Sequence, residues 1–187
     1  YTTTLTALEQ QAREVSSTQQ AKLLAERLLN LANQEISTLA AEDIVLMADS
    51  YGHLVSNVRE LGGSKVDFEA LINQGEILRA KVRSLELATD ENEAQLEKLY
   101  RSDVWYDINY SLSAINYWQA WASLGIAYTK AGERDRVKWL NKAENGFKTS
   151  SVRILYPSIV YGSWLGMGYV AAANGRPELA EQRFRRL

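Results

Sequence analysis

The chain has 187 residues and a formal net charge of −2, and 46% of its residues are hydrophobic, enough to bury a substantial core without covalent cross-links. It contains no cysteine, so disulfide bonds and thiolate metal sites are excluded; the compartment stays undetermined, with a cytoplasmic location preferred. The two prolines and the many helix-forming residues predict an all-α fold of antiparallel helical hairpins, with about six to eight helices.

Charges and aromatic residues divide unevenly along the chain. Residues 1–100 carry 9 basic and 16 acidic side chains, whereas residues 101–187 carry 12 basic and 7 acidic ones. Of the 18 Trp, Tyr and Phe residues, 15 lie at position 100 or later. We therefore expect an acidic region of long helices at 1–89 and an aromatic-rich region at 90–187, which together form one continuous array.

Regular apolar spacing predicts three helices in the first region, at about 18–35, 44–61 and 68–85. The last two are expected to form an antiparallel hairpin. The turn between them, Leu61-Gly62-Gly63-Ser64, can end one helix at a glycine, and Ser64 can cap the next helix.

Two features of this hairpin leave alternatives open. Gly75 occupies an apolar stripe position, which predicts either a close backbone approach or a local packing gap. If the apolar stripe of the two hairpin helices were exposed in the folded chain, it would indicate a coiled-coil dimer. Self-association through the N-terminal helices is therefore a further expectation. The stripe positions concerned are Met47, Leu54, Leu78 and Val82.

The second region predicts five more helical segments. They begin at Asp90, at Ser102 or Asp103, at Glu133, near Ser158 and at Pro177. In the segment that begins at Glu133, the apolar positions expected to face inward are Val137, Leu140, Ala143 and Phe147.

Two runs of this region, 108–129 and 154–175, contain no charged residue. Each is long enough to cross a bilayer. The first, however, carries several Ser, Asn and Gln residues, and the second contains Pro157 and no long stretch of Leu or Ile. We therefore interpret both runs as buried helices, and a membrane is not an expected partner.

Few residues in the sequence indicate a catalytic site or a metal site. His53 is the only histidine, and Asp49 lies four positions before it, on the same helical face. No serine or cysteine nucleophile motif accompanies this pair, so we favour a surface histidine and a protein that is not an enzyme. We expect no metal and no cofactor. Nucleic acid is not an expected partner either, because the basic residues form no cluster except at Arg183, Arg185 and Arg186.

One pattern occurs twice. The first copy reads Trp121-x-x-Leu124-Gly125-x-x-Tyr128, and the second reads Trp164-x-x-Met167-Gly168-x-x-Ala171 and continues to Ala180 and Phe184. Over residues 118–187 the chain resembles the tetratricopeptide repeat, a helical-hairpin family that stacks into a solenoid. The resemblance implies that the glycine of each copy lies where two helices cross. The 43-residue separation of the copies is longer than the family's period of about 34 residues and indicates longer helices.

The resemblance also implies a concave groove lined by the first helix of each hairpin. Carried over by position, the groove-facing residues are Gln119, Ala122, Ile126, Thr129 and Lys130 in the first copy, and Gly162, Leu165, Tyr169, Ala172 and Ala173 in the second. The family's best-known sites hold a C-terminal carboxylate with lysine and asparagine. The matching positions here are Ala122, Ile126, Leu165 and Tyr169, so we expect an apolar ligand or a helix instead.

The sequence therefore predicts a non-enzymatic interaction or scaffold module that binds a protein or peptide of unknown identity. The alternative is a ligand-sensing or regulatory helical domain, with a deep pocket lined by Trp118, Trp121, Tyr161 and Tyr169. Because the chain begins at Tyr1 and ends within an expected helix, we also expect it to be a piece of a longer protein.

Overall fold

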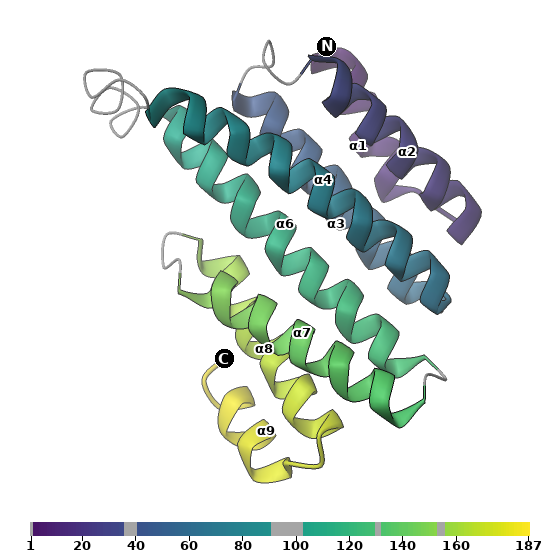
Figure 1. Cartoon of the computed structure of the whole chain (residues 1–187), viewed down its shortest axis with the longest axis vertical. Coiled ribbons are helices and arrows are strands. Elements are labelled where there is room, and N and C mark those ends of the chain that lie inside the picture. Colours follow the sequence, from purple (N-terminus) through teal and green to yellow (C-terminus); the bar gives the residue numbers. More distant parts are fainter. Residues whose placement is uncertain (1, 36–40, 91–102, 130–131, 153–155) are drawn as a thin grey trace.

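The computed structural model describes residues 2–35, 41–90, 103–129, 132–152 and 156–187, and this part of the chain contains eight helices and no strand (Figure 1). The all-α prediction is confirmed. The helix predicted at 90–100 falls almost wholly outside the described residues. The eight helices are α1 (Thr2–Arg13), α2 (Thr18–Glu35), α3 (Ala41–Glu60), α4 (Lys65–Asp90), α6 (Asp103–Tyr128), α7 (Glu133–Ser151), α8 (Pro157–Ala173) and α9 (Pro177–Phe184).

The turn between α3 and α4 forms as its sequence predicts. Gly62 adopts a φ of 69°, a conformation in which glycine pays no steric penalty. Ser64 and Asp67 cap α4 reciprocally: the Ser64 backbone N–H donates to Asp67 Oδ2 at 2.8 Å, and the Asp67 backbone N–H donates to Ser64 Oγ at 3.3 Å. This cap fixes the point at which α4 departs from α3.

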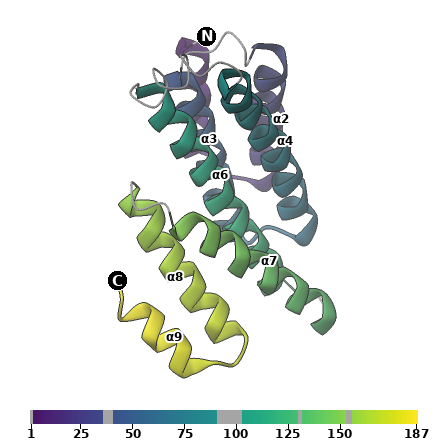
Figure 2. The ribbon, with the colours of Figure 1, turned by 60° about the vertical axis from the view of Figure 1, so that its left-hand side comes forward.

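Helix α6 is the centre of the molecule. It packs against α3 and α4 on one side and against α7 and α8 on the other (Figures 1 and 2). Its buried serines satisfy their hydroxyls within the helix: Ser111, Ser113 and Ser123 each donate to the carbonyl four residues earlier, at 2.7–2.8 Å. Burial on several sides explains the charge-free run of this helix. Within the described residues, no helix is both long and apolar enough to cross a membrane.

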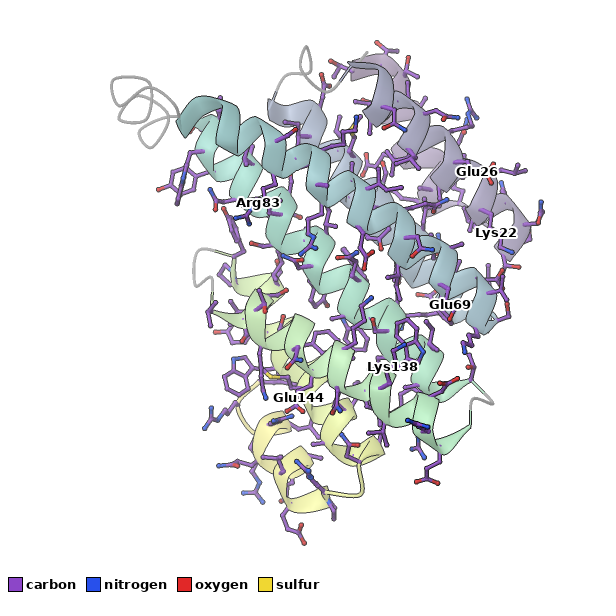
Figure 3. The ribbon with its side chains drawn as sticks, viewed as in Figure 1. Lys22, Glu26, Glu69, Arg83, Lys138 and Glu144 are labelled. Carbon is purple, nitrogen blue, oxygen red and sulfur yellow. The ribbon has the colours of Figure 1, made fainter. Side chains whose placement is uncertain are left out.

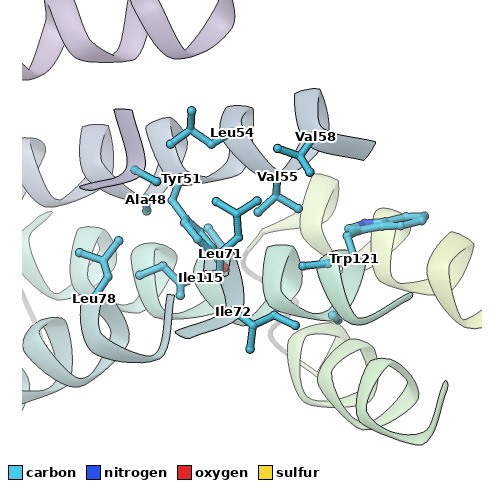
Figure 4. Packing of buried hydrophobic residues seen from close by; sticks show 14 of the residues in the cluster. Ala48, Tyr51, Leu54, Val55, Val58, Leu71, Ile72, Leu78, Ile115 and Trp121 are labelled. Carbon is cyan, nitrogen blue, oxygen red and sulfur yellow. The ribbon is translucent and has the colours of Figure 1, made fainter. Parts of the chain in front are cut away.

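The buried stripes of α3 and α4 form the middle of the core (Figure 4). Met47, Leu54, Leu78 and Val82 are each at most 2% exposed. A dimer through this stripe is therefore excluded, because the chain's own helices already cover it. On α7, Leu140, Ala143 and Phe147 are buried as predicted, whereas the expectation for Val137 was wrong: it is 47% exposed.

Aromatic rings pack onto glycines throughout the bundle. A Cβ at Gly125 would lie 2.6 Å from Phe68 Cζ, and one at Gly75 would lie 2.6 Å from Tyr51 Cζ. Gly75 thus faces a side chain of α3, which is neither of the two alternatives that the sequence left open. The same arrangement pairs Gly52 with Trp118, Gly162 with Tyr117, Gly166 with Phe147 and Gly168 with Phe184.

The last helix is held by a partly buried ion pair. Glu144 of α7, labelled in Figure 3, accepts a hydrogen bond from Arg183 Nη2 of α9 at 2.9 Å, and Arg183 Nη1 donates to the Met167 carbonyl at 2.7 Å. Burial acts to raise the pKa of Glu144, but the hydrogen bonds from Arg183 and Lys148 outweigh it and hold the pKa below its usual value. One arginine therefore joins α7, α8 and α9.

Candidate functional site

An open groove of about 600 Å³ lies where the α3–α4 turn meets the C-terminal end of α6. We call it the Arg59 groove. Its walls come from the last turn of α3, the Gly-rich turn, the first turn of α4 and the end of α6, and they consist of Arg59, Glu60, Gly62, Gly63, Ser64, Phe68, Gly125, Tyr128 and Thr129. Because Gly125 has no side chain, the Phe68 ring packs directly onto α6, and both residues line the groove.

Arg59 is the dominant charge in this groove. Its guanidinium carbon lies 4.0 Å from the centroid of the Trp121 ring, a cation–π contact. Partial burial of the guanidinium lowers the pKa of Arg59, although the residue as a whole is exposed to solvent. Among the described residues, Arg59 makes no ion pair and no side-chain hydrogen bond. Its N–H donors are therefore available to a ligand.

Tyr128 forms the rim of the groove next to Arg59 and is 58% exposed. Partial burial raises the pKa of Tyr128, and the charges of Arg136 and Arg59 act in the opposite direction. Arg136 Nη2 donates to the Ala173 carbonyl at 2.9 Å, which places this second guanidinium at the end of α8. The Tyr128 hydroxyl thus lies in the field of two arginines.

A row of aromatic rings connects the groove to α8 and α9. The Trp121 centroid is 5.1 Å from Phe147 and 6.0 Å from Tyr169, and Tyr169 is 5.6 Å from Phe184, all edge to face. Trp121 and Phe147 are buried, whereas Tyr169 is 42% exposed. The exposed face of Tyr169 therefore continues the surface that begins at Tyr128.

The structure buries three of the residues that the repeat resemblance placed in a groove. Ala122 and Ile126 are 0% exposed, and Gln119 is 9% exposed. Gln119 Nε2 donates to the Ile72 carbonyl of α4 at 3.1 Å. Because α3 and α4 cover this side of α6, the chain itself occupies the face and no ligand can reach these side chains.

The other predicted groove residues have different surroundings. Thr129 lines the Arg59 groove, and Lys130 lies outside the described residues. Leu165 is half-buried against the core, and Gly162 lies beneath the Tyr117 ring.

The last three predicted groove residues, Tyr169, Ala172 and Ala173, lie at the C-terminal end of α8. Tyr169 is exposed beside the aromatic row, and the Ala173 carbonyl is held by Arg136. Ala172 lines a second, more open groove of about 590 Å³ together with Phe184 and other residues of α9. The structure thus brings Thr129 and Tyr169 toward one surface and leaves the rest of the set elsewhere.

Sequence reasoning missed Arg59 and identified Tyr128 as part of the repeated pattern. Arg59 follows the apolar stripe position Val58 and has the appearance of a solvated residue at a helix end. Its contact with Trp121 joins helices that are far apart in the sequence, so no local pattern indicates it. The only signal in the sequence was Gly125, which marks a point where α6 presents no side chain.

His53 and Asp49 lie in a second polar cluster, between α1, α3 and α6. Asp49 Oδ1 accepts a hydrogen bond from the Tyr110 hydroxyl at 2.8 Å, and His53 Nε2 lies 3.7 Å from Glu9 Oε1. Burial, as the largest effect, raises the pKa of Asp49 above its usual value, although the Tyr110 hydrogen bond acts to lower it. Asp49 therefore orients Tyr110, whereas His53 faces Glu9.

Asp49→Asn should gain stability relative to the wild type as the pH rises from about 4 toward 7. The folded state binds the Asp49 proton more tightly than the unfolded state, because its pKa is raised. As the pH rises from the pKa of Asp49 in the unfolded state to its higher pKa in the folded state, ionisation of Asp49 lowers the stability of the wild type. The amide of the Asp49→Asn variant does not ionise, so the variant has no such loss. Urea unfolding across this range tests the prediction. An Asp49→Asn variant that loses stability relative to the wild type as the pH rises would contradict it.

Comparison with known proteins gives no relative: the chain matches no family model, and no curated protein or solved structure is significantly similar to it.

Proposed function

We propose that this protein is a non-enzymatic interaction module that binds a peptide or a helix along the surface running from the Arg59 groove to Tyr169. The observation that carries the proposal is the conjunction of an open groove with two large exposed aromatic side chains at its edge, Tyr128 and Tyr169, which are 58% and 42% exposed. Tyrosine and arginine are enriched in protein interfaces because each combines a broad contact face with hydrogen-bond donors.

The packing order of the helices supports a repeat-like arrangement. Helix α1 contacts α3, α3 contacts α6 and α6 contacts α8, while α2, α4, α7 and α9 each contact the helix that precedes them. In tetratricopeptide solenoids, the first helices of successive hairpins adjoin in this way and line the binding face. The exposed groove residues Arg59, Tyr128 and Tyr169 belong to α3, α6 and α8, which would be first helices in such an array.

The two residues that suggested catalysis already have partners within the chain, which favours a binding module over an enzyme. His53 faces Glu9 of α1, and Asp49 is hydrogen-bonded to Tyr110. No nucleophile accompanies either residue in the sequence. Arg59 and Tyr128 are residue types that are enriched in protein interfaces, and the Tyr128 hydroxyl already donates to the Tyr169 carbonyl at 3.5 Å.

The double variant Tyr128→Ala/Tyr169→Ala tests the proposal. Removal of two interface tyrosines should weaken partner binding by at least about 2 kcal/mol, or about 30-fold. The measurement is quantitative capture of partners from lysate by the immobilised chain, followed by titration of a captured partner against each variant. Circular dichroism is needed to show that helicity is unchanged, because the Tyr169 ring also packs against Trp121 and Phe184.

Tyr106→Ala is the matched control. Tyr106 is a tyrosine of α6 that is 46% exposed and lies near the other end of that helix. The Tyr106→Ala variant should capture the same partners as the wild type. Equal binding by the wild type and the double variant would contradict the proposal, because the partner would then occupy a different face.

A further inference from the structure

We infer that the partner segment that occupies the Arg59 groove is acidic and places an Asp or Glu carboxylate on Arg59 while an apolar side chain packs against Phe68 and Gly125. The inference rests on the proposed function and deepens it by naming the chemistry of the partner. It differs from the sequence-based expectation of an apolar ligand or helix, since Arg59 lies outside the repeat-like region and was not part of that expectation.

Among the described residues, the Arg59 guanidinium has no carboxylate partner. Three other arginines do, because Arg13 pairs with Glu9, Arg183 with Glu144 and Arg185 with Glu181, whereas Arg186 lies over the Trp164 ring in the way that Arg59 lies over Trp121. Arg59 has only the face of the Trp121 ring. A guanidinium has five N–H donors in its plane, and stacking on a ring leaves this whole plane free.

The Trp121 ring covers one face of the guanidinium, whereas Arg59 as a whole is exposed to solvent. An incoming carboxylate can therefore reach the free N–H donors and form two parallel hydrogen bonds with them. Because the guanidinium carbon already lies 4.0 Å from the centroid of the Trp121 ring, part of the side-chain freedom of Arg59 is lost before binding.

The groove fits a carboxylate better than a phosphate. Phosphate groups bind where free backbone N–H groups or several arginines converge. Here the N–H groups of the turn are already bonded: Gly62 donates to the Arg59 carbonyl, Gly63 to the Val58 carbonyl and Ser64 to Asp67. The N-terminus of α4 is thus occupied by its own carboxylate, and a single guanidinium remains in the groove.

The groove wall itself carries one positive and one negative side chain, Arg59 and Glu60. Arg136 adds a second positive charge beside Tyr128. The acidic residue in the wall, Glu60, makes no ion pair with Arg59 and accepts a hydrogen bond from Ser56 at 3.3 Å. The apolar part of the wall is the edge of the Phe68 ring beside Gly125, and because Phe68 is only 3% exposed, a partner's apolar side chain can contact this edge alone.

The test is selection of binders from a displayed library of random peptides, with the immobilised full chain as the target. The enriched peptides should share an Asp or Glu next to an apolar residue. Replacement of this acid in the peptide by its amide should weaken binding at least about tenfold, and Arg59→Gln in the protein should do the same. The two changes together should weaken binding little more than either one alone.

Two further variants separate recognition from folding. Arg59→Lys keeps the charge and loses the planar pair of donors, so it should recover only part of the affinity. Arg134→Gln, which removes an exposed arginine of α7, is the matched control and should bind like the wild type. Because the peptide's own amide variant leaves the protein untouched, loss of binding there cannot come from unfolding.

Three outcomes would overturn the inference. One outcome is the selection of neutral peptides that bind the wild type and fail to bind Tyr128→Ala/Tyr169→Ala. This result would support the proposed function and exclude the acidic partner. A selection that enriches no peptide would count against both. Self-association of the chain that Arg59→Gln abolishes would make a second copy the occupant of the groove.

Discussion

Gly75→Ala is expected to lower the free energy of unfolding by about 2 kcal/mol, although alanine is normally the better helix former by up to about 1 kcal/mol. The added Cβ would lie 2.6 Å from Cζ of Tyr51 and 3.0 Å from Cγ of Gln119. Tyr51 is 1% exposed, and its hydroxyl donates to the Leu71 carbonyl at 2.9 Å. The ring therefore cannot move aside without breaking a buried hydrogen bond and disturbing the core shown in Figure 4.

Urea unfolding monitored by circular dichroism measures this loss. Gly132→Ala is the control, because a Cβ there meets no atom within 4 Å, and its effect should stay below about 1 kcal/mol. A mechanism-specific check is Tyr51→Phe, which removes the hydroxyl that crowds Gly75. In that background, Gly75→Ala should be less destabilising than in the wild type. Equal losses in both backgrounds would show that the strain does not come from the Tyr51 hydroxyl.

The parts of the fold that the sequence predicted are those that local residues determine. The turn at Gly62 and the Ser64–Asp67 cap follow from residues that are adjacent in the chain. The helix that begins at Pro177 is likewise a local feature. The first helix, Thr2–Arg13, was not predicted; it buries only Leu5, Leu8 and Ala12, too short a stripe to stand out in the sequence.

The site was harder to predict because it depends on packing between distant helices. Position matching to a repeat family assigned Ala122 and Ile126 to a groove, but α3 and α4 cover that face of α6 and bury both residues. Arg59 comes from outside the repeat-like region and reaches Trp121 only in the folded chain. An apolar stripe in a sequence identifies a buried face. It does not identify which helix covers that face or where a gap remains.

Phe147→Ala should have the largest effect on the C-terminal half, a loss of about 3–5 kcal/mol of stability. Phe147 is 0% exposed. Its ring lies over Gly166 of α8 and contacts Trp121 of α6 at a centroid distance of 5.1 Å. Since most domains are stable by only about 5–15 kcal/mol, the variant should lose a large fraction of its folded population in mild urea.

The loss should also be uneven along the chain. Phe147 joins α7 to both α6 and α8, so hydrogen exchange should accelerate in α8 and α9 more than in α1 and α2. Val152→Ala is the control, because Val152 is 74% exposed and should change stability by less than about 0.5 kcal/mol. Uniform acceleration across all helices would mean that the chain unfolds as one unit and that Phe147 has no local role.

This variant also connects stability to the proposed binding surface. Trp121 supports Arg59 on one side and contacts both Phe147 and Tyr169. Loss of the Phe147 ring should therefore release Trp121 and shift Tyr169 relative to the Arg59 groove. We expect peptides selected on the wild type to bind Phe147→Ala more weakly even in conditions where it remains folded, because the contact residues would no longer be held in one arrangement. Unchanged affinity in the folded variant would show that the groove keeps its shape without the aromatic row.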